Sequence, residues 1–286
     1  TLENGPLQAI VDEVHASDVP CFIQLKWGTP GLTYLWHNLP ETGTASMASE
    51  LTDEDIAMVI SDAADASRKL QDMGFDGIEL NCAVGNTPAS FLSRYENDRP
   101  ADDPYGPGSI ENRCRIVTDM IAAIHEQCGD DFPVQVRMDG IEENDADLGQ
   151  NALMSSMEEI AAIAQTLESA GAASLHLMLG VFGYHEAQFL NDGHFGGVLD
   201  GSTSGCGFML GAAAYVKQHV SIPVGCATYM DPAHAPDLFE AALNDGKVDF
   251  LFINRPLANA DQEYCNKLRE NRIDEIRPCT RCLHCA

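Results

Sequence analysis

The stretch SMEEIAAIAQTLESAGAASLHLML, residues 156–179, contains one complete unit of the fold. Ser156 followed by Glu159 is a capping box, which is typical of a helix start. Apolar residues then recur at helical spacing, at Ile160, Ile163, Ala164 and Leu167. Gly171 stands where helices commonly end, and Ser174–Leu179 is an apolar run typical of a buried parallel strand. The stretch therefore predicts a helix followed by a parallel strand.

The same unit recurs along the chain. Five further apolar runs predict strands, at Pro20–Leu25, Gly77–Asn81, Pro133–Met138, Ile222–Cys226 and Val248–Ile253. Amphipathic patterns predict helices, one before the first strand over Leu7–Val14, one after a Thr52 cap, and one that begins at Pro236 and ends at Gly246. Repeated units of this kind predict a parallel α/β fold. A closed (β/α)8 barrel needs eight strands, two more than the six predicted here.

Composition narrows the class of protein. With 286 residues, 45% of them hydrophobic, the chain can form one large domain with a full core. It has no apolar run of about 18 residues, and Thr1–Pro6 lacks the regions of a signal peptide. We therefore expect a cytoplasmic protein. The formal net charge of −28 disfavours nucleic acid or an anionic membrane as a partner.

Three cysteines lie close together near the end of the sequence, at Cys279, Cys282 and Cys285. Thiolates at this spacing can bind one metal centre, either an iron–sulfur cluster or zinc. Both centres usually need four ligands, so the fourth is expected elsewhere or beyond this sequence. The other seven cysteines are scattered, and most are expected to be small core residues.

The segment Phe182–Phe208 shows no pattern of a helix or strand and is rich in Gly, His and Asp. A loop of this length in a compact domain is usually functional. If the fold is a barrel, the loop leaves the carboxyl end of a strand, where the active sites of such barrels lie.

Several ordered motifs resemble the old yellow enzyme family of FMN-dependent oxidoreductases. They are GFDGIEL at 74–80 with FLS at 91–93, YGPGSIENR at 105–113, and NRPLA at 254–258. GVFGYHEA at 180–187 is similar to the 2,4-dienoyl-CoA reductase branch. The cysteine segment agrees with that branch, whose members carry a four-iron, four-sulfur cluster just after the barrel.

The resemblance implies a (β/α)8 TIM barrel that begins at about its third strand. Residues 1–276 would form an FMN-binding barrel domain without its two N-terminal strands. Residues 277–286 would begin the iron–sulfur segment. Domains that bind FAD and NAD(P)H would follow in a longer protein.

The resemblance also assigns cofactor-binding residues. It places Gln24 at the flavin pyrimidine edge and Arg137 beside flavin N1 and O2, and it assigns Asn254, Arg255 and Thr228 to the FMN phosphate region. Each has a plainer interpretation: a strand-end amide for Gln24, a salt bridge for Arg137, and a surface cation for Arg255. Thr228 lies in a loop where the family usually has glycines, so close backbone approach to a phosphate is harder.

The catalytic positions depart from the family. The proton-donating Tyr of the family would align with Asn86, which cannot act as an acid. Asn81 and Asn86 remain candidates for binding a substrate carbonyl. Tyr184 and His185 are the candidate proton donors, with water as the alternative. A solvent-exposed loop histidine is the plainer interpretation of His185.

The function expected from the resemblance is reduction of a C=C bond conjugated to a carbonyl. Electrons would come from NAD(P)H through the iron–sulfur cluster bound by the three cysteines, and the substrate would be a small enone or enoyl thioester. A homo-oligomer is compatible with the resemblance. Two alternatives stay open: an oxidative relative such as an amine dehydrogenase, and a non-catalytic barrel that serves as an electron-transfer or interaction subunit.

Overall fold

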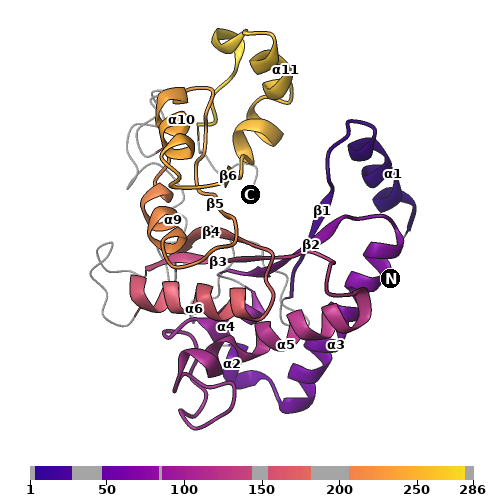
Figure 1. Cartoon of the computed structure of the whole chain (residues 1–286), viewed down its shortest axis with the longest axis vertical. Helices are drawn as coiled ribbons and strands as arrows, with labels where there is room; N and C mark the ends of the chain where they lie inside the picture. The colour runs from indigo at the N-terminus through magenta and orange to yellow at the C-terminus, as the bar shows by residue number, and fades with distance from the viewer. Residues whose placement is uncertain (1–3, 28–46, 84–85, 144–153, 182–205, 281–286) are drawn as a thin grey trace. The chain divides into compact units, whose positions relative to one another are not determined.

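The computed structural model describes most of the chain, namely residues 4–27, 47–83, 86–143, 154–181 and 206–280 (Figure 1). The predicted functional loop therefore lies almost entirely outside the described residues. None of the helices in the described ranges is long and apolar enough to cross a membrane.

All six predicted strands are present in the described residues. They are β1 (Phe22–Leu25), β2 (Gly77–Cys82), β3 (Val134–Glu143), β4 (Ser174–Val181), β5 (Val224–Cys226) and β6 (Phe250–Leu251). Neighbours in the sheet follow chain order from β1 to β6. The pairings of β1 with β2, β2 with β3, and β5 with β6 are parallel. This order and direction confirm the predicted α/β class.

Helices separate the strands, as the sequence predicts. They are α1 (Asn4–His15), α2 (Met47–Glu50), α3 (Asp53–Asp72), α4 (Thr87–Leu92), α5 (Ile110–Cys128), α6 (Met157–Ser169), α9 (Leu210–Lys217), α10 (Pro236–Asn244) and α11 (Tyr264–Arg269). Two short helical turns follow β6, the π-helical η1 (Pro256–Ala260) and the 3-10 helical η2 (Ile273–Glu275).

Local signals set the ends of these helices. At the start of α6, the N–H of Ser156 donates to Glu159, and the N–H of Glu159 donates to Ser156 Oγ. This reciprocal pair is the predicted capping box. The predicted cap of α3 at Thr52 is also present. Gly171 and Gly246 follow α6 and α10 with φ values of 102° and 67°, a conformation that glycine adopts without steric cost.

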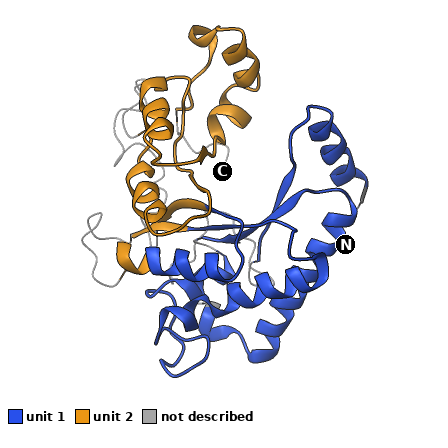
Figure 2. Cartoon of the chain, in the orientation of Figure 1, with its two compact units in different colours: residues 1–33, 46–138, 161–175 blue, residues 34–45, 139–160, 176–286 orange. Residues whose placement is uncertain are grey.

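The chain divides into two compact units, which Figure 2 distinguishes by colour. Unit 1 comprises residues 1–33, 46–138 and 161–175, and unit 2 comprises 34–45, 139–160 and 176–286. In unit 1, α3 packs on α5, while α4 packs on both β2 and α5.

The strands of unit 1 have one apolar and one polar face. Ile78 and Leu80 of β2, and Val134 and Val136 of β3, are fully buried. Successive side chains of a strand point to opposite faces, so the intervening residues share the other face. That face carries polar side chains, from Glu79, Asn81, Gln135 and Arg137.

Unit 2 has a smaller core near the end of the chain. Ala233, Tyr264 and Ile276 are buried together, and Leu257 and Leu268 pack against them. The cluster joins α11 to the segment that leads to Cys279.

The scattered cysteines behave mostly as predicted. Four of the seven are buried, at Cys21, Cys82, Cys114 and Cys226, whereas Cys128 and Cys206 are half-buried and Cys265 is exposed. Burial raises the pKa of Cys114 and Cys226 to about 12. They therefore remain protonated thiols, unlike the thiolates that metals need.

Candidate functional site

The register of β1, β2 and β3 brings polar residues from all three strands into neighbouring positions. Gln24 is opposite Glu79, and Asn81 is opposite Arg137. Glu79 and Asn81 are two residues apart on β2, so they share a face. The candidate site is therefore on the polar face of unit 1, near the carboxyl ends of β1 and β2 and beside the first half of β3.

Hydrogen bonds join these residues. Gln24 Nε2 donates to Glu79 Oε1. Asn81 Nδ2 donates to Gln24 Oε1 over 2.9 Å, and Arg137 Nη1 approaches the same oxygen at 3.4 Å. We call Gln24, Glu79, Asn81 and Arg137 the amide cluster. Three of its four members were predicted as site residues, and the structure brings those three together.

Exposure differs sharply within the amide cluster. Glu79 and Asn81 are only 6% and 4% exposed to solvent, whereas Gln24 is an exposed residue. The buried carboxylate and the buried amide thus lie behind an accessible amide. A ligand can reach Gln24 without the cluster opening.

Asn86 is connected to the cluster through the backbone of one residue, Ala83. The N–H of Ala83 donates to Asn81 Oδ1 over 3.3 Å, and Asn86 Nδ2 donates to the carbonyl of Ala83 over 3.1 Å. Asn86 is buried and occupies the N-cap position of α4. The two predicted substrate-binding residues therefore lie on either side of Ala83.

The segment after β2 is held by side chains that donate to the end of α4. Asn97 Nδ2 donates to the carbonyls of Phe91 and Tyr105, and Arg113 Nε donates to the carbonyl of Leu92 over 2.7 Å. Arg113 is 1% exposed, so this charge-assisted bond is shielded from water. These contacts fix α4, and with it Asn86.

Glu79 is the residue of this cluster that the sequence analysis did not assign. A signal was present in GIELNC, residues 77–82, where Gly77, Glu79 and Asn81 alternate with apolar residues. Alternation of period two indicates that Glu79 and Asn81 share a face. Its pairing with Gln24 could not be read from the sequence, because the register of β1 on β2 decides it.

In unit 2, the loop after β5 has an unusual backbone. Thr228 and Tyr229 have φ values of 73° and 50°, which are uncommon for residues with a side chain. Thr228 Oγ1 accepts the N–H of Leu179 over 3.3 Å, which leaves its own hydroxyl hydrogen available to donate. The loop adopts the left-handed conformation without glycine, and such turns can direct successive N–H groups at an anion.

Arg255 is at the start of η1 in the same unit. The carbonyl of the preceding Asn254 accepts the N–H of Ala258 over 2.7 Å. Arg255 is half-buried, and it has no ion-pair partner among the described residues of this acidic chain. It is therefore a cation available to an anionic ligand.

Only part of the predicted metal and catalytic set is described. Cys279 is 9% exposed, and it follows Arg277, whose N–H donates to Asp261 Oδ2 over 2.9 Å. Cys282, Cys285, Tyr184 and His185 all lie outside the described residues. Within the described ranges, no group of three acidic, histidine or cysteine side chains could hold a metal ion.

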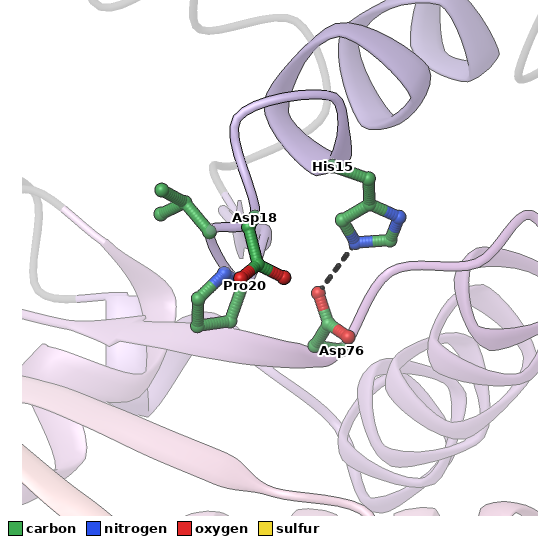
Figure 3. A pocket seen from close by; sticks show the side chains of 5 residues that line it. His15, Asp18, Pro20 and Asp76 are labelled. Atoms are coloured by element: carbon green, nitrogen blue, oxygen red, sulfur yellow. Dashed lines mark hydrogen bonds and ion pairs between the residues drawn. The ribbon is translucent and has the colours of Figure 1, made fainter.

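A separate pocket of about 350 Å³ lies at the other ends of β1 and β2 (Figure 3). It is lined by His15, Asp18, Val19, Pro20 and Asp76. His15 Nε2 contacts Asp76 Oδ2 over 2.8 Å, and the N–H of Cys21 donates to the same oxygen. That backbone donor, followed by His15, lowers the pKa of Asp76. The pocket contains none of the predicted site residues.

Comparison with known proteins gives a family match. Residues 5–179 match the sequence model of the NADH:flavin oxidoreductase / NADH oxidase family. This range includes the whole amide cluster and α4.

Three curated relatives are similar over most of the chain. A metal reductase of Desulforamulus reducens is 32% identical over 85% of this chain and 33% of its own length. An NADH oxidase of Thermoanaerobacter brockii is 31% identical over 96% of this chain and 40% of its own. A cinnamate reductase of Clostridium sporogenes is 28% identical over 82% and 34%. The chain thus spans about a third to two-fifths of their length.

A solved structure supports the fold. A 2-naphthoyl-CoA reductase in complex with 2-naphthoyl-CoA matches with a TM-score of 0.75 at 24% identity. The match covers 98% of this chain and 42% of that one.

Proposed function

The chain belongs to the NADH:flavin oxidoreductase / NADH oxidase family, and on that premise we propose that it forms the FMN-binding part of an enzyme that reduces an activated C=C bond. The bond would be conjugated to a carbonyl, as in an enone or enoyl thioester. The cinnamate reductase among the relatives, whose name denotes such a reaction, supports this choice.

The amide cluster is the observation that carries the proposal. Amide and guanidinium groups from three adjacent strands converge on one face of the sheet, near the carboxyl ends of β1 and β2. In α/β barrels this is the end that binds ligands. The pyrimidine edge of a flavin presents carbonyl oxygens and ring nitrogens, which such donors can bind.

The donors of the cluster fit that edge. Gln24 is accessible, and Arg137 supplies a fixed positive charge beside it. A cation at this position stabilises negative charge on a reduced flavin. FMN, when bound, supplies the hydride that the double bond receives.

Substrate binding is assigned to the two asparagines. Asn81 and Asn86 carry amide N–H groups that can donate to a substrate carbonyl and polarise the conjugated bond. Neither amide ionises near neutral pH, so the proton must come from another group. Tyr184, His185 and solvent remain the proposed sources.

Phosphate binding is assigned to unit 2. The left-handed turn at Thr228 and the cation of Arg255, with the adjoining Asn254, are of a kind that binds anions. These assignments concern unit 2 alone, and each stays a prediction that substitution can test.

The electron supply is assigned to the cysteine segment. Cys279, Cys282 and Cys285 would bind an iron–sulfur cluster that passes electrons from NAD(P)H. The remaining ligand and the FAD and NAD(P)H sites would belong to a longer protein, since the relatives extend well beyond the match. A cytoplasmic location and a homo-oligomer are part of the same proposal.

The test is the visible spectrum of the anaerobically purified full-length protein, with assays of FMN and iron. Bound FMN and about four irons per chain are expected. Arg137→Met should weaken FMN binding about tenfold or more, because a charge-assisted contact is lost. Lys247→Met is the matched control, since Lys247 pairs with Asp245 at an exposed position of unit 2. A protein that binds neither FMN nor iron would leave the non-catalytic alternative.

A further inference from the structure

We propose that Glu79 is a positioning residue that fixes the orientation of the Gln24 amide, and thereby makes the accessible side of the amide cluster a surface of hydrogen-bond donors. The inference rests on the proposed FMN site, which it deepens. It assigns a role to a buried carboxylate that the sequence analysis left unassigned.

The amide cluster has a carboxylate at one end, Glu79, and a guanidinium at the other, Arg137. A carboxylate accepts hydrogen bonds and donates none, whereas a guanidinium donates and accepts none. Gln24 lies between Glu79 and Arg137, and its amide has one donating and one accepting end. Only one orientation satisfies both neighbours: the nitrogen faces Glu79, and the oxygen faces Arg137.

The same logic fixes Asn81. The oxygen of Gln24 needs a donor, so Asn81 must turn its nitrogen toward it, as it does at 2.9 Å. The oxygen of Asn81 then faces the N–H of Ala83, which donates to it over 3.3 Å. One buried carboxylate therefore sets the direction of two amides in succession.

This orientation determines which hydrogen-bonding groups Gln24 presents to a ligand. Its oxygen already accepts from Asn81 and is approached by Arg137, while only one of its two amide hydrogens is used, by Glu79. Asn81 likewise has one amide hydrogen left among the described contacts. The accessible amide of Gln24 thus presents a donor and no spare acceptor, so it selects acceptor or anionic atoms of the ligand.

Burial makes this orientation matter. Glu79 is 6% exposed and Asn81 is 4% exposed, so water cannot easily replace a lost partner. A buried polar atom that loses its hydrogen bond pays its full desolvation cost. The cluster should therefore favour one arrangement strongly, as long as position 79 is a carboxylate.

The experiment exchanges the two side chains. In the full-length protein, Glu79→Gln leaves two amides that can flip together. The double substitution Glu79→Gln with Gln24→Glu restores a carboxylate–amide pair and the net charge. It leaves position 24 without any N–H donor. Glu142→Gln is the control, because it removes a different buried carboxylate. Glu142 lies on β3 and accepts the N–H of Ser155.

Two readouts separate the possible failures. The first is the urea midpoint of unfolding, which does not depend on FMN. The second is the dissociation constant of FMN, measured by flavin fluorescence. Glu79→Gln should lower the midpoint and weaken FMN binding about tenfold, and the exchange should restore the midpoint but weaken binding at least about 100-fold. Glu142→Gln should leave FMN binding within about twofold of the parent.

The outcomes are distinct. An exchanged protein that binds FMN as tightly as the parent would overturn the role of Glu79 while the proposed function stands. A parent that binds no FMN would overturn the proposed function, and the midpoints would still decide the orientation. In that case, a midpoint restored by the exchange supports the positioning role, and one lowered further contradicts it.

Discussion

The hydroxyl of Tyr264 donates a hydrogen bond of 2.8 Å to Oδ1 of Asp231, and this bond joins α11 to the loop after β5. Tyr264 is 1% exposed, and Asp231 is completely buried. The same hydroxyl accepts the N–H of Ala233 over 2.8 Å, while the other oxygen of Asp231 contacts His234 Nδ1. Burial raises the pKa of Tyr264, so its hydroxyl stays protonated and keeps donating.

Tyr264→Phe is expected to destabilise the protein by about 2–4 kcal/mol, because it leaves one buried acceptor and one buried donor without a partner. The free energy of unfolding in urea measures this. The control is Tyr215→Phe, whose hydroxyl makes no hydrogen bond within the described part of the chain. Equal losses in the two variants would show that the buried hydrogen bonds of the Tyr264 hydroxyl add no stability.

Asp261 gives the clearest pH dependence. Lys267 Nζ contacts its carboxylate over 2.7 Å and the N–H of Arg277 donates to it, which lowers its pKa to about 2. A carboxyl with a lowered folded-state pKa contributes stability above its unfolded pKa and loses it as the pH falls through the folded pKa. The contribution should therefore be complete above about pH 5 and lost between about pH 4 and pH 2.

Asp261→Asn should lower the urea midpoint of unfolding at pH 6. The midpoints of the variant and the parent should converge as the pH approaches 2. Urea titrations at intervals between pH 6 and pH 2 would measure the difference. Asp274→Asn is the control, since it removes an exposed carboxyl of η2 that takes no part in these contacts. A difference that stays constant over this pH range would contradict the assigned pKa.

Gly108 and Gly211 should respond in opposite directions to substitution by alanine. A Cβ at Gly108 would lie 2.1 Å from the carbonyl oxygen of Ala101, so the backbone would have to move. A Cβ at Gly211, in α9, would meet nothing within 4 Å. Gly108→Ala should cost about 1–3 kcal/mol, and Gly211→Ala should gain a few tenths to about 1 kcal/mol.

Thermal unfolding of both variants, beside the parent protein, would measure this pair. A Gly108→Ala variant with the same thermal stability as the parent would mean that the loop between α4 and α5 adapts at little cost. That loop carries Asn97, which donates to the carbonyl of Phe91 at the end of α4. The position of α4, and of Asn86 at its start, in the protein without FMN would then be the next quantity to measure.

The fold was predictable where its signals are local. Capping at Ser156, the helix end before Gly171 and the apolar run of β4 all act within a few residues, and the structure confirms each. The pairing of Gln24 with Glu79 was not predictable. The two are 55 residues apart, and only the register of β1 on β2 brings them together.

The candidate site was predictable to a similar degree. The resemblance identified Gln24, Asn81 and Arg137 as site residues, but it could not give their mutual hydrogen bonds or the direction of each amide. The backbone at Thr228 was not predictable from the sequence, because the turn adopts a left-handed conformation without glycine. That a threonine makes close approach of the backbone to a phosphate harder stays a prediction.

Neighbouring contacts hold Cys279, the first residue of the cysteine motif. Cys279 is buried beyond Ile276, which belongs to the apolar cluster with Tyr264, and Asp261 binds the N–H of Arg277 between them. These contacts hold the start of the segment in one place. Cys279→Ser should therefore reduce the iron content of the anaerobically purified full-length protein from about four per chain to less than half, because one thiolate ligand is lost.

Cys265→Ser is the matched control, since Cys265 is an exposed thiol of α11 outside the CxxCxxC motif. Its iron content should equal that of the parent. Zinc in place of iron in the parent would favour the structural-zinc interpretation of the motif, and equal iron in all three proteins would remove Cys279 from the ligand set. Because the iron assay needs neither substrate nor FMN, it judges the metal assignment independently of the proposed reaction.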